Sequence, residues 1–201
     1  MVPPKIVSEY ERIQTRQAII AHTKKLISFK RGIKKITVDD IIQSVGIGKG
    51  SFYSYFPSKE ACIYEVIEQA YETDLTQFKV IMDEELSLKE KIEKFLWDVF
   101  LAEDGIDRYM SANDFEMILR KLPPEYSVRD ESATEAVIMG MMELLDLERI
   151  QLESLAAFLD CISFVATQTG ISKEAKDETL GVLVQTVAEY VEKNIKNEGE
   201  I

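Results

Sequence analysis

The stretch from Thr37 to Glu60, TVDDIIQSVGIGKGSFYSYFPSKE, constrains the fold more than any other part of the chain. Thr37 is a favourable N-cap for a helix, and Asp40 gives a looser form of the capping box, which prefers Glu or Gln at that place. Gly46 is expected to end this helix, because glycine accepts the left-handed backbone that a helix stop often needs. The helix repeats apolar residues at helical spacing, at Val38, Ile41, Ile42 and Val45.

A second short helix is predicted directly after this glycine. Ile47 is the apolar plug between the two helices, and the segment from Gly48 to Phe56 forms the second one. Pro57 and Ser58 then end that segment and cap the helix that follows. Two short helices joined by a glycine-containing turn are the signature of a helix-turn-helix unit, whose second helix enters the major groove of DNA.

This stretch resembles the DNA-binding domain of the tetracycline-repressor (TetR) family of bacterial transcription regulators. A turn followed by GSFYSYFPSKE is a much more specific signal than a bare helix-turn-helix pattern. The close match covers roughly residues 10–67, and the rest of the chain shares only a helical pattern of suitable length. The matching residues are Thr37, Asp40, Ile41, Val45, Gly46, Ile47, Gly50, Ser51, Phe52, Tyr53, Tyr55, Phe56, Ser58, Lys59 and Glu60.

The resemblance implies which residues touch DNA. Lys49 and Ser51 would lie at the exposed start of the second helix, where base edges and nearby phosphates are read, and Gly50 would allow close approach. The remaining contacts would go to phosphates. The predicted DNA-binding residues are Thr37, Lys49, Gly50, Ser51, Tyr53, Tyr55 and Lys59.

Two of these assignments have a structural alternative. Tyr53 and Tyr55 could be core aromatics with a solvated hydroxyl, although they share the helix with Lys49 and Ser51. Thr37 is expected to cap its helix in any case, so that a phosphate contact would be an additional role. Phe52 and Phe56, four residues apart, are assigned to the core of the domain instead.

The charge of the chain is distributed very unevenly. The net charge of −12 on its own disfavours a nucleic-acid partner. Residues 1–60, which we call the head, hold 11 Lys and Arg against 5 Asp and Glu, a net charge of +6. Residues 61–201, the body, hold 13 against 31, a net charge of −18, for which solubility is the preferred explanation. A basic head on an acidic body is expected when only the head touches phosphates.

The body shows the apolar periodicity of helices, so the predicted fold class is all-α. We expect two domains: a three-helix helix-turn-helix DNA-binding domain at residues 1–60, and a larger helical effector-binding and dimerisation domain at residues 61–201. The helix that begins at Ser58 would join them. The expected helices cover residues 8–31, 37–46, 48–56, 58–85, 87–102, 107–121, 128–145, 148–169 and 172–196.

The last two predicted helices each carry a continuous apolar face. Such a pair could simply pack onto the chain's own core. In the family that the chain resembles, the corresponding pair meets its twofold mate as a four-helix bundle. A dimer also suits the head, because two short helices one DNA turn apart can read a palindrome. The residues expected at this dimer interface are Leu155, Leu159, Ile162, Leu183, Val187, Tyr190 and Val191.

The middle helices are rich in methionine and aromatic residues, the side chains that a small-molecule pocket would use. At helical spacing each of them alone is better explained as ordinary core, and the cavity is an expectation drawn from the resemblance. The candidates for an effector pocket are Trp97, Phe100, Tyr109, Met110, Phe115, Met139 and Met142.

Other chemistries are disfavoured. An enzyme is not expected, because the single histidine, His22, lies among lysines and no nucleophile–base pair is present. Cys62 and Cys161 lack metal-ligand spacing and are expected to be buried, reduced thiols, so we expect neither a metal nor a cofactor. The run from Gly46 to Ser51, GIGKGS, lacks the spacing of a phosphate-binding loop.

The predicted location is cytoplasmic, with no membrane partner. The N-terminus lacks the apolar core of a signal peptide, and no apolar run approaches the roughly 20 residues of a membrane span.

These observations predict a homodimeric transcription regulator, a repressor that binds a palindromic operator and is released by a small-molecule effector. Its expected partners are double-stranded DNA, a second copy of the chain and an unidentified small molecule. The alternative is a helical adaptor that binds only protein, against which the basic head and its specific motif argue.

Overall fold

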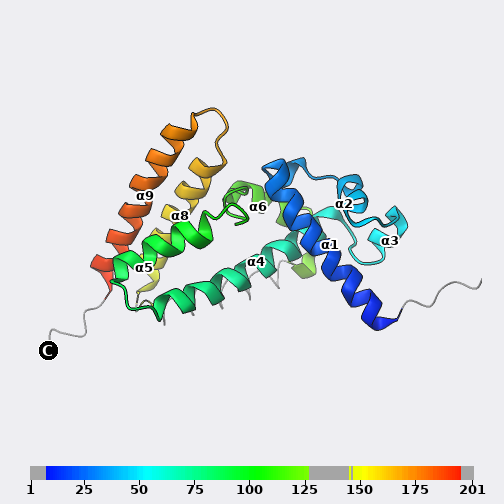
Figure 1. Ribbon diagram of the computed structural model, residues 1–201, viewed down its shortest axis with the longest axis horizontal. Helices are drawn as coiled ribbons and strands as arrows, with labels where there is room; N and C mark the ends of the chain where they lie inside the picture. The colour runs from blue at the N-terminus through cyan, green and yellow to red at the C-terminus, as the bar shows by residue number, and fades with distance from the viewer. Residues whose placement is uncertain (1–7, 127–144, 146, 196–201) are drawn as a thin grey trace, which may run out of the picture.

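Helices lie in two groups at opposite ends of an elongated molecule (Figure 1). One end holds α1 (Glu9–Lys30), α2 (Val38–Val45) and α3 (Lys49–Tyr53), and the other holds α8 (Arg149–Thr167) and α9 (Lys173–Asn194). This computed structural model describes residues 8–126, 145 and 147–195. Every regular element in that part of the chain is helical, which confirms the predicted all-α fold.

The first helix begins and ends at well-defined caps. The Ser8 hydroxyl accepts the N–H of Glu11 at 3.2 Å, and the Glu11 carboxylate accepts the N–H of Ser8 at 2.9 Å. At the other end Arg31 has a left-handed backbone, with φ of 51°, and Gly32 follows with φ of 149°. A short 3₁₀ turn, η1 (Ile33–Lys35), then leads into α2.

The long helix α4 (Lys59–Met82) joins the two ends of the molecule (Figure 1). The Ser58 hydroxyl caps it by accepting the N–H of Ala61 at 3.0 Å, as the sequence predicts. Its first half is buried in the head, whereas Phe78 and Ile81 near its end are buried in the body. One continuous helix therefore carries residues of both hydrophobic cores.

The middle of the chain departs from the predicted helices in two places. The helix expected at residues 87–102 is α5 (Leu88–Phe95) followed by a π-helical turn, η2 (Leu96–Phe100). The helix expected from residue 107 is α6 (Ala112–Leu119), which starts later because Ser111 caps it by accepting the N–H of Asp114 at 3.3 Å. The helix expected at residues 128–145 lies almost wholly outside the described residues.

The segment between η2 and α6 approaches η2 closely at Gly105. A Cβ at this glycine would lie 2.9 Å from the carbonyl oxygen of Val99 and 3.0 Å from that of Phe100. A side chain here would therefore push the segment away from η2, which explains the small residue at this bend.

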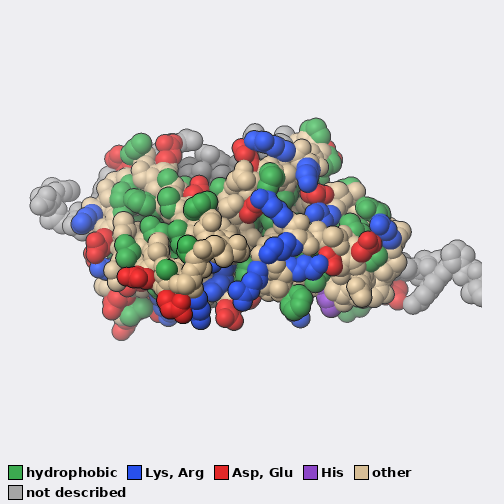
Figure 2. Space-filling view, turned by 90° about the horizontal axis from the view of Figure 1, so that it is seen from above, with side chains coloured by type: hydrophobic (Ala, Val, Ile, Leu, Met, Phe, Trp, Pro, Cys, Tyr) green, Lys and Arg blue, Asp and Glu red, His purple; other side chains and the backbone are tan. Residues whose placement is uncertain are grey.

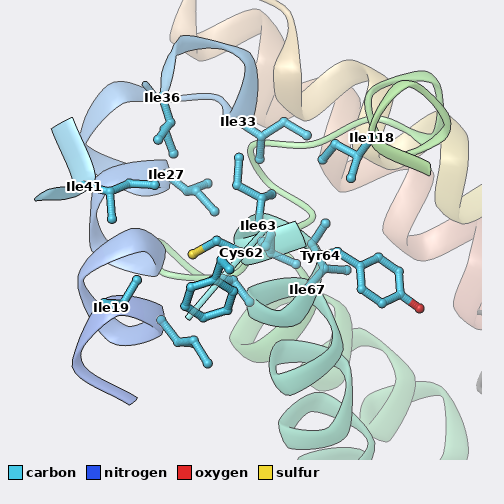
Figure 3. Close-up of a cluster of buried hydrophobic side chains, with 14 of the residues drawn as sticks. Ile19, Ile27, Ile33, Ile36, Ile41, Cys62, Ile63, Tyr64, Ile67 and Ile118 are labelled. Carbon is cyan, nitrogen blue, oxygen red and sulfur yellow. The ribbon is translucent and has the colours of Figure 1, made fainter. Parts of the chain in front are cut away.

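The buried side chains form two hydrophobic clusters. The first combines the head with the start of α4, and the second combines the end of α4 with α5, α8 and α9. Figure 3 shows Ile118, which comes from α6, within the first cluster beside side chains of the head. Because α6 belongs to the body by sequence, the head core is completed by a body helix.

Candidate functional site

The turn between α2 and α3 is fixed by two residues. Gly46 is left-handed, with φ of 78°, and its N–H donates to the carbonyl of Ile42 at 2.9 Å. Ile47 donates to the same carbonyl at 3.1 Å, and its side chain packs against the first hydrophobic cluster. These contacts confirm the predicted helix stop and apolar plug, and the two helices form the predicted helix-turn-helix unit.

Two phenylalanines anchor α3 in the head. Phe52 and Phe56 are both 0% exposed, and their rings stack with centroids 5.8 Å apart. Their burial confirms the predicted core role and fixes which side of α3 faces solvent. The exposed residues of α3 are Lys49, Gly50, Ser51 and Tyr53, all of them among the predicted DNA-binding residues.

Glycine at the start of α3 is not required by packing inside the protein. A Cβ at Gly48 or at Gly50 would meet no atom within 4 Å in the described structure, and neither residue has a positive φ. An added side chain at either position would therefore clash only with a bound partner and not with the described residues of the protein itself. The backbone at the start of α3 is open to close approach.

Tyr55 and Lys59 are less exposed than these four residues. Tyr55 is half-buried against the first cluster, and the guanidinium of Arg12 lies 5.9 Å from its ring centroid. Lys59 is half-buried, with its Nζ 3.7 Å from a carboxylate oxygen of Glu60. Both residues follow α3, which ends at Tyr53, so Tyr55 does not share the helix with Lys49 and Ser51 as predicted.

Thr37 caps α2 with the predicted capping box. Its hydroxyl accepts the N–H of Asp40 at 3.2 Å, and the Asp40 carboxylate accepts the N–H of Thr37 at 2.8 Å. Lys30 lies 2.6 Å from the same carboxylate. Hydrogen bonds from Lys30 and from Thr37 lower the pKa of Asp40 to about 2. A phosphate contact by Thr37 stays a prediction, and it would have to share the groups that already bind Asp40.

Lys49 is held by an exposed ion pair. Its Nζ lies 3.4 Å from a carboxylate oxygen of Asp39, and both side chains are more than half exposed. An exposed pair of this kind contributes only about 0–1 kcal/mol, so Lys49 can exchange Asp39 for a stronger anion at little cost.

Lysine and arginine side chains gather over the middle and the α1–α3 half of the molecule in Figure 2. This view agrees with the net charge of +6 that the sequence gives to residues 1–60. A basic surface of this kind attracts phosphates over a distance of about 10 Å at moderate salt.

The body contains a cavity of about 300 Å³ between α4, α6 and α8. Its volume lies at the lower end of the range of about 300–1,000 Å³ that small-molecule pockets occupy. Aromatic rings make up much of its wall, and three aspartates also line it. The aromatic lining residues are Tyr71, Phe78, Phe95, Phe100 and Phe115.

The residues predicted for an effector pocket are divided among several places. Phe100, Met110 and Phe115 line this cavity, whereas Tyr109 lines a second, more polar hollow between the end of α1 and the α8–α9 turn. Trp97 is 41% exposed and lines neither. Met139 and Met142 lie outside the described residues.

The aspartates of the cavity are functional candidates that the sequence reasoning missed. Asp74, Asp107 and Asp160 come from α4, from the segment before α6 and from α8. Burial and repulsion by Asp74 raise the pKa of Asp107 to about 7, and burial raises the pKa of Asp74 to about 6. The signal was an acidic residue inside the apolar face of a helix, as with Asp74 beside Leu75 and Phe78.

The seven predicted dimer-interface residues all belong to the core of one chain or its edge. Leu155, Ile162, Val187 and Val191 are buried in the second hydrophobic cluster. Leu159, Leu183 and Tyr190 are half-buried against the same cluster. The apolar surface that α8 and α9 leave open is therefore made by other residues.

Several large apolar side chains on α8, α9 and the turn between them face solvent. The exposed fractions are 65% for Ile150, 60% for Phe164, 44% for Ile171 and 60% for Val182. Figure 2 shows hydrophobic side chains at the surface of this end of the molecule. Cys161 on α8 is also exposed, so the prediction of two buried thiols is confirmed for Cys62 and is wrong for Cys161.

The same helix has the composition of a membrane segment. Within the described part of the chain, Ile150–Thr167 alone is long and apolar enough to cross a membrane, with a mean hydropathy of 1.4 and 28% of it buried. A single such helix is weak evidence for a membrane segment, because a helix that packs against protein has the same composition.

Known proteins resemble this chain most clearly in the head. A family model described as "Bacterial regulatory proteins, tetR family" matches residues 19–66. The HTH-type transcriptional regulator SAB2452 of Staphylococcus aureus is 34% identical over 74 residues, which are 37% of this chain and 40% of that protein. The HTH-type transcriptional repressor KstR2 of Mycolicibacterium smegmatis is 39% identical over 62 residues, 31% of this chain and 30% of that protein.

A likeness to a solved structure extends over the whole fold. The crystal structure of the reduced form of E. coli NemR covers 93% of this chain and 100% of its own, with a TM-score of 0.62 and 16% sequence identity. At this identity the likeness shows a shared all-helical fold. The matches to SAB2452 and KstR2, in contrast, span less than half of either regulator. Residues 19–66 of this chain therefore form a helix-turn-helix domain of the tetR family of bacterial regulatory proteins.

Proposed function

We propose that this protein is a transcriptional repressor that binds a palindromic operator as a homodimer and leaves it when a small molecule occupies the body. The observation that carries the proposal is the exposed start of α3, where Lys49, Gly50 and Ser51 face solvent above the buried Phe52. A short helix that is anchored in the core on one side and exposed to solvent on the other can enter the major groove. The proposal places the protein in the cytoplasm.

The open apolar surface of α8 and α9 supports the homodimer. Ile150 and Phe164 lie about four helical turns apart on α8, so they share one face, and Val182 is exposed on α9. Two such surfaces related by a twofold axis would form a four-helix contact. Each dimer would then present two α3 helices to half-sites about one DNA turn, roughly 34 Å, apart.

Helix α6 connects the cavity to the head. Phe115 lines the cavity and also stacks on Tyr64 in the head core, with ring centroids 6.3 Å apart. The neighbouring Asp114 binds Lys34 of η1 at 2.5 Å. A ligand that fits the cavity better in one position of α6 would shift the head, to the extent of its differential affinity for the two states.

Selection of genomic DNA fragments by the purified protein at moderate salt tests the proposal. A palindrome shared by the enriched fragments is the expected result, with half-sites spaced by one helical turn. Binding without a shared motif would contradict sequence-specific repression. The absence of binding even at low salt, where phosphate contacts are strongest, would favour the protein-binding adaptor instead.

Two lysine substitutions are expected to affect operator binding differently. Lys59→Ala should weaken binding to all sequences alike and reduce the salt slope by about 1, because it removes one phosphate contact. Lys49→Ala should also change the preferred sequence. Both effects are measured by fluorescence anisotropy titrations at several salt concentrations. Lys79→Ala, an exposed lysine in the body half of α4, is the matched control and should leave affinity unchanged. Unchanged affinity in both head variants would refute this interface.

A further inference from the structure

We propose that the cavity of the body takes an organic cation with an apolar frame, such as an aromatic quaternary ammonium ion. The inference rests on the proposed function, since it names the class of the effector. The wall of the cavity combines aromatic rings with Asp74, Asp107 and Asp160. No lysine, arginine or histidine is among the described residues that line it. The cavity is therefore apolar and carries negative charge that nothing on its described wall neutralises.

Asp107 is the least accessible of the three carboxyl groups. It is 7% exposed, and the hydroxyl of Tyr71 donates to it over a long distance of 3.4 Å. Burying a carboxylate is costly unless a cation or several hydrogen bonds compensate it. The segment that carries Asp107 packs closely against η2 at Gly105. A bound cation would add a charge of opposite sign to the hydrogen bond from Tyr71.

The charged groups around the cavity also favour a cationic ligand. Asp107 faces Asp74 on α4 and Asp160 on α8, and its pKa is raised by its burial and, to a smaller extent, by repulsion from these two carboxylates. Asp74 in turn interacts with Lys24 of α1, which lowers its pKa, and with Asp104, which raises it, while burial dominates. Among the described residues, the charge balance around the cavity is acidic. Cation binding would favour the ionised carboxylates and release protons.

The arrangement suits a larger organic cation better than a metal ion. Among the described residues, no three His, Cys, Asp or Glu side chains lie close enough together to hold a metal. The carboxyl groups come instead from three segments around a cavity of about 300 Å³. Aromatic faces attract a cation through their negative ring electrostatics, and they also bury the apolar frame. A molecule with a dispersed positive charge uses both parts of the wall.

The test compares cations with neutral molecules of the same shape. The probes are phenyltrimethylammonium and benzyltrimethylammonium, paired with tert-butylbenzene and neopentylbenzene, in which carbon replaces the charged nitrogen. Calorimetric titration of the full chain at pH 8 should show at least one cation binding about tenfold more tightly than its neutral partner. Affinity for the cation, but not for the neutral partner, should fall between pH 8 and pH 6, across the pKa values of about 7 and about 6 of Asp107 and Asp74.

Variants assign the preference to the carboxyl groups. Asp107→Asn and Asp160→Asn should each reduce cation affinity by about tenfold and leave the neutral molecules unaffected. Asp160 is exposed, so its variant is expected to fold normally and keeps the test decisive if Asp107→Asn does not fold. Asp98→Asn, an exposed aspartate outside the cavity, is the control. Equal binding of cation and neutral partner, or no binding of either cation, would overturn the assignment.

A parallel DNA titration separates the two proposals. A cation that binds through Asp107 and Asp160 but leaves operator affinity unchanged would support the ligand class and contradict effector release. Operator binding together with cations that bind no better than their neutral partners would leave the repressor intact and refute the organic cation.

Discussion

Replacing Phe52 with alanine is expected to lower the free energy of unfolding of the head by about 3–5 kcal/mol, the usual cost of removing a buried phenylalanine ring. Phe52 is 0% exposed, and its ring contacts Phe56 on one side and Tyr53 edge-on, with centroids 5.8 and 5.4 Å apart. Because Phe52 anchors α3, operator binding should be lost as well. Chemical denaturation followed by circular dichroism measures the change, and DNA titration measures the loss.

The neighbouring tyrosine supplies the control for this prediction. Tyr53 is 48% exposed on the same helix, and its ring meets that of Phe52 edge-on. Tyr53→Ala should lower the free energy of unfolding by only about 0.5–1.5 kcal/mol, the usual contribution of an aromatic pair, and should still weaken DNA binding. Equal stability of the two variants would show that Phe52 does not anchor the head.

Replacing Phe164 with glutamate is expected to convert the proposed homodimer to a monomer. Phe164 is 60% exposed in the single chain, and burying it in a twofold contact would contribute about 1.5–3 kcal/mol from each copy. Losing both contributions should weaken dimerisation by about 100-fold or more. Burying a charge in the same place would weaken it further. Sedimentation velocity over a range of protein concentrations measures the dimerisation constant.

Operator affinity should fall in parallel, because a monomer presents only one α3. Val80→Glu introduces the same charge at an apolar residue of α4 that is 55% exposed, and it should leave the dimer and its DNA binding intact. A dimeric Phe164→Glu protein with normal operator affinity would show that the chain associates through another surface.

The head could be predicted closely because its boundaries are set by neighbouring residues. Thr37 and Asp40 form their capping box within four residues of chain, and Gly46 adopts the left-handed backbone that its place in the sequence suggests. The burial of Phe52 and Phe56 follows from their spacing in the same local way. Such features depend little on the rest of the fold.

The body was less predictable because apolar spacing does not show whether an apolar face packs against the chain's own core or against a second copy. Ile162 and Val187 have the pattern of an interface and are buried inside one chain, whereas Phe164 remains exposed. The cavity was harder still. Asp74 and Asp107 are 33 residues apart in sequence, and only the packing of α4 against the segment before α6 brings them to one wall.

The continuity of α4 has a mechanical consequence. At 1.5 Å per residue its 24 residues measure about 36 Å, and a helix of that length with both ends packed behaves as a stiff rod. A rotation of only about 5° at the body end would carry its other end through about 3 Å, by the same helix geometry. That distance is close to the roughly 3.4 Å rise of one base step. In a twofold dimer the two α4 helices would move in directions related by the twofold axis. A change no larger than a side-chain shift beside Phe78 would then alter the distance between the two α3 helices, so that they no longer match the spacing of the half-sites.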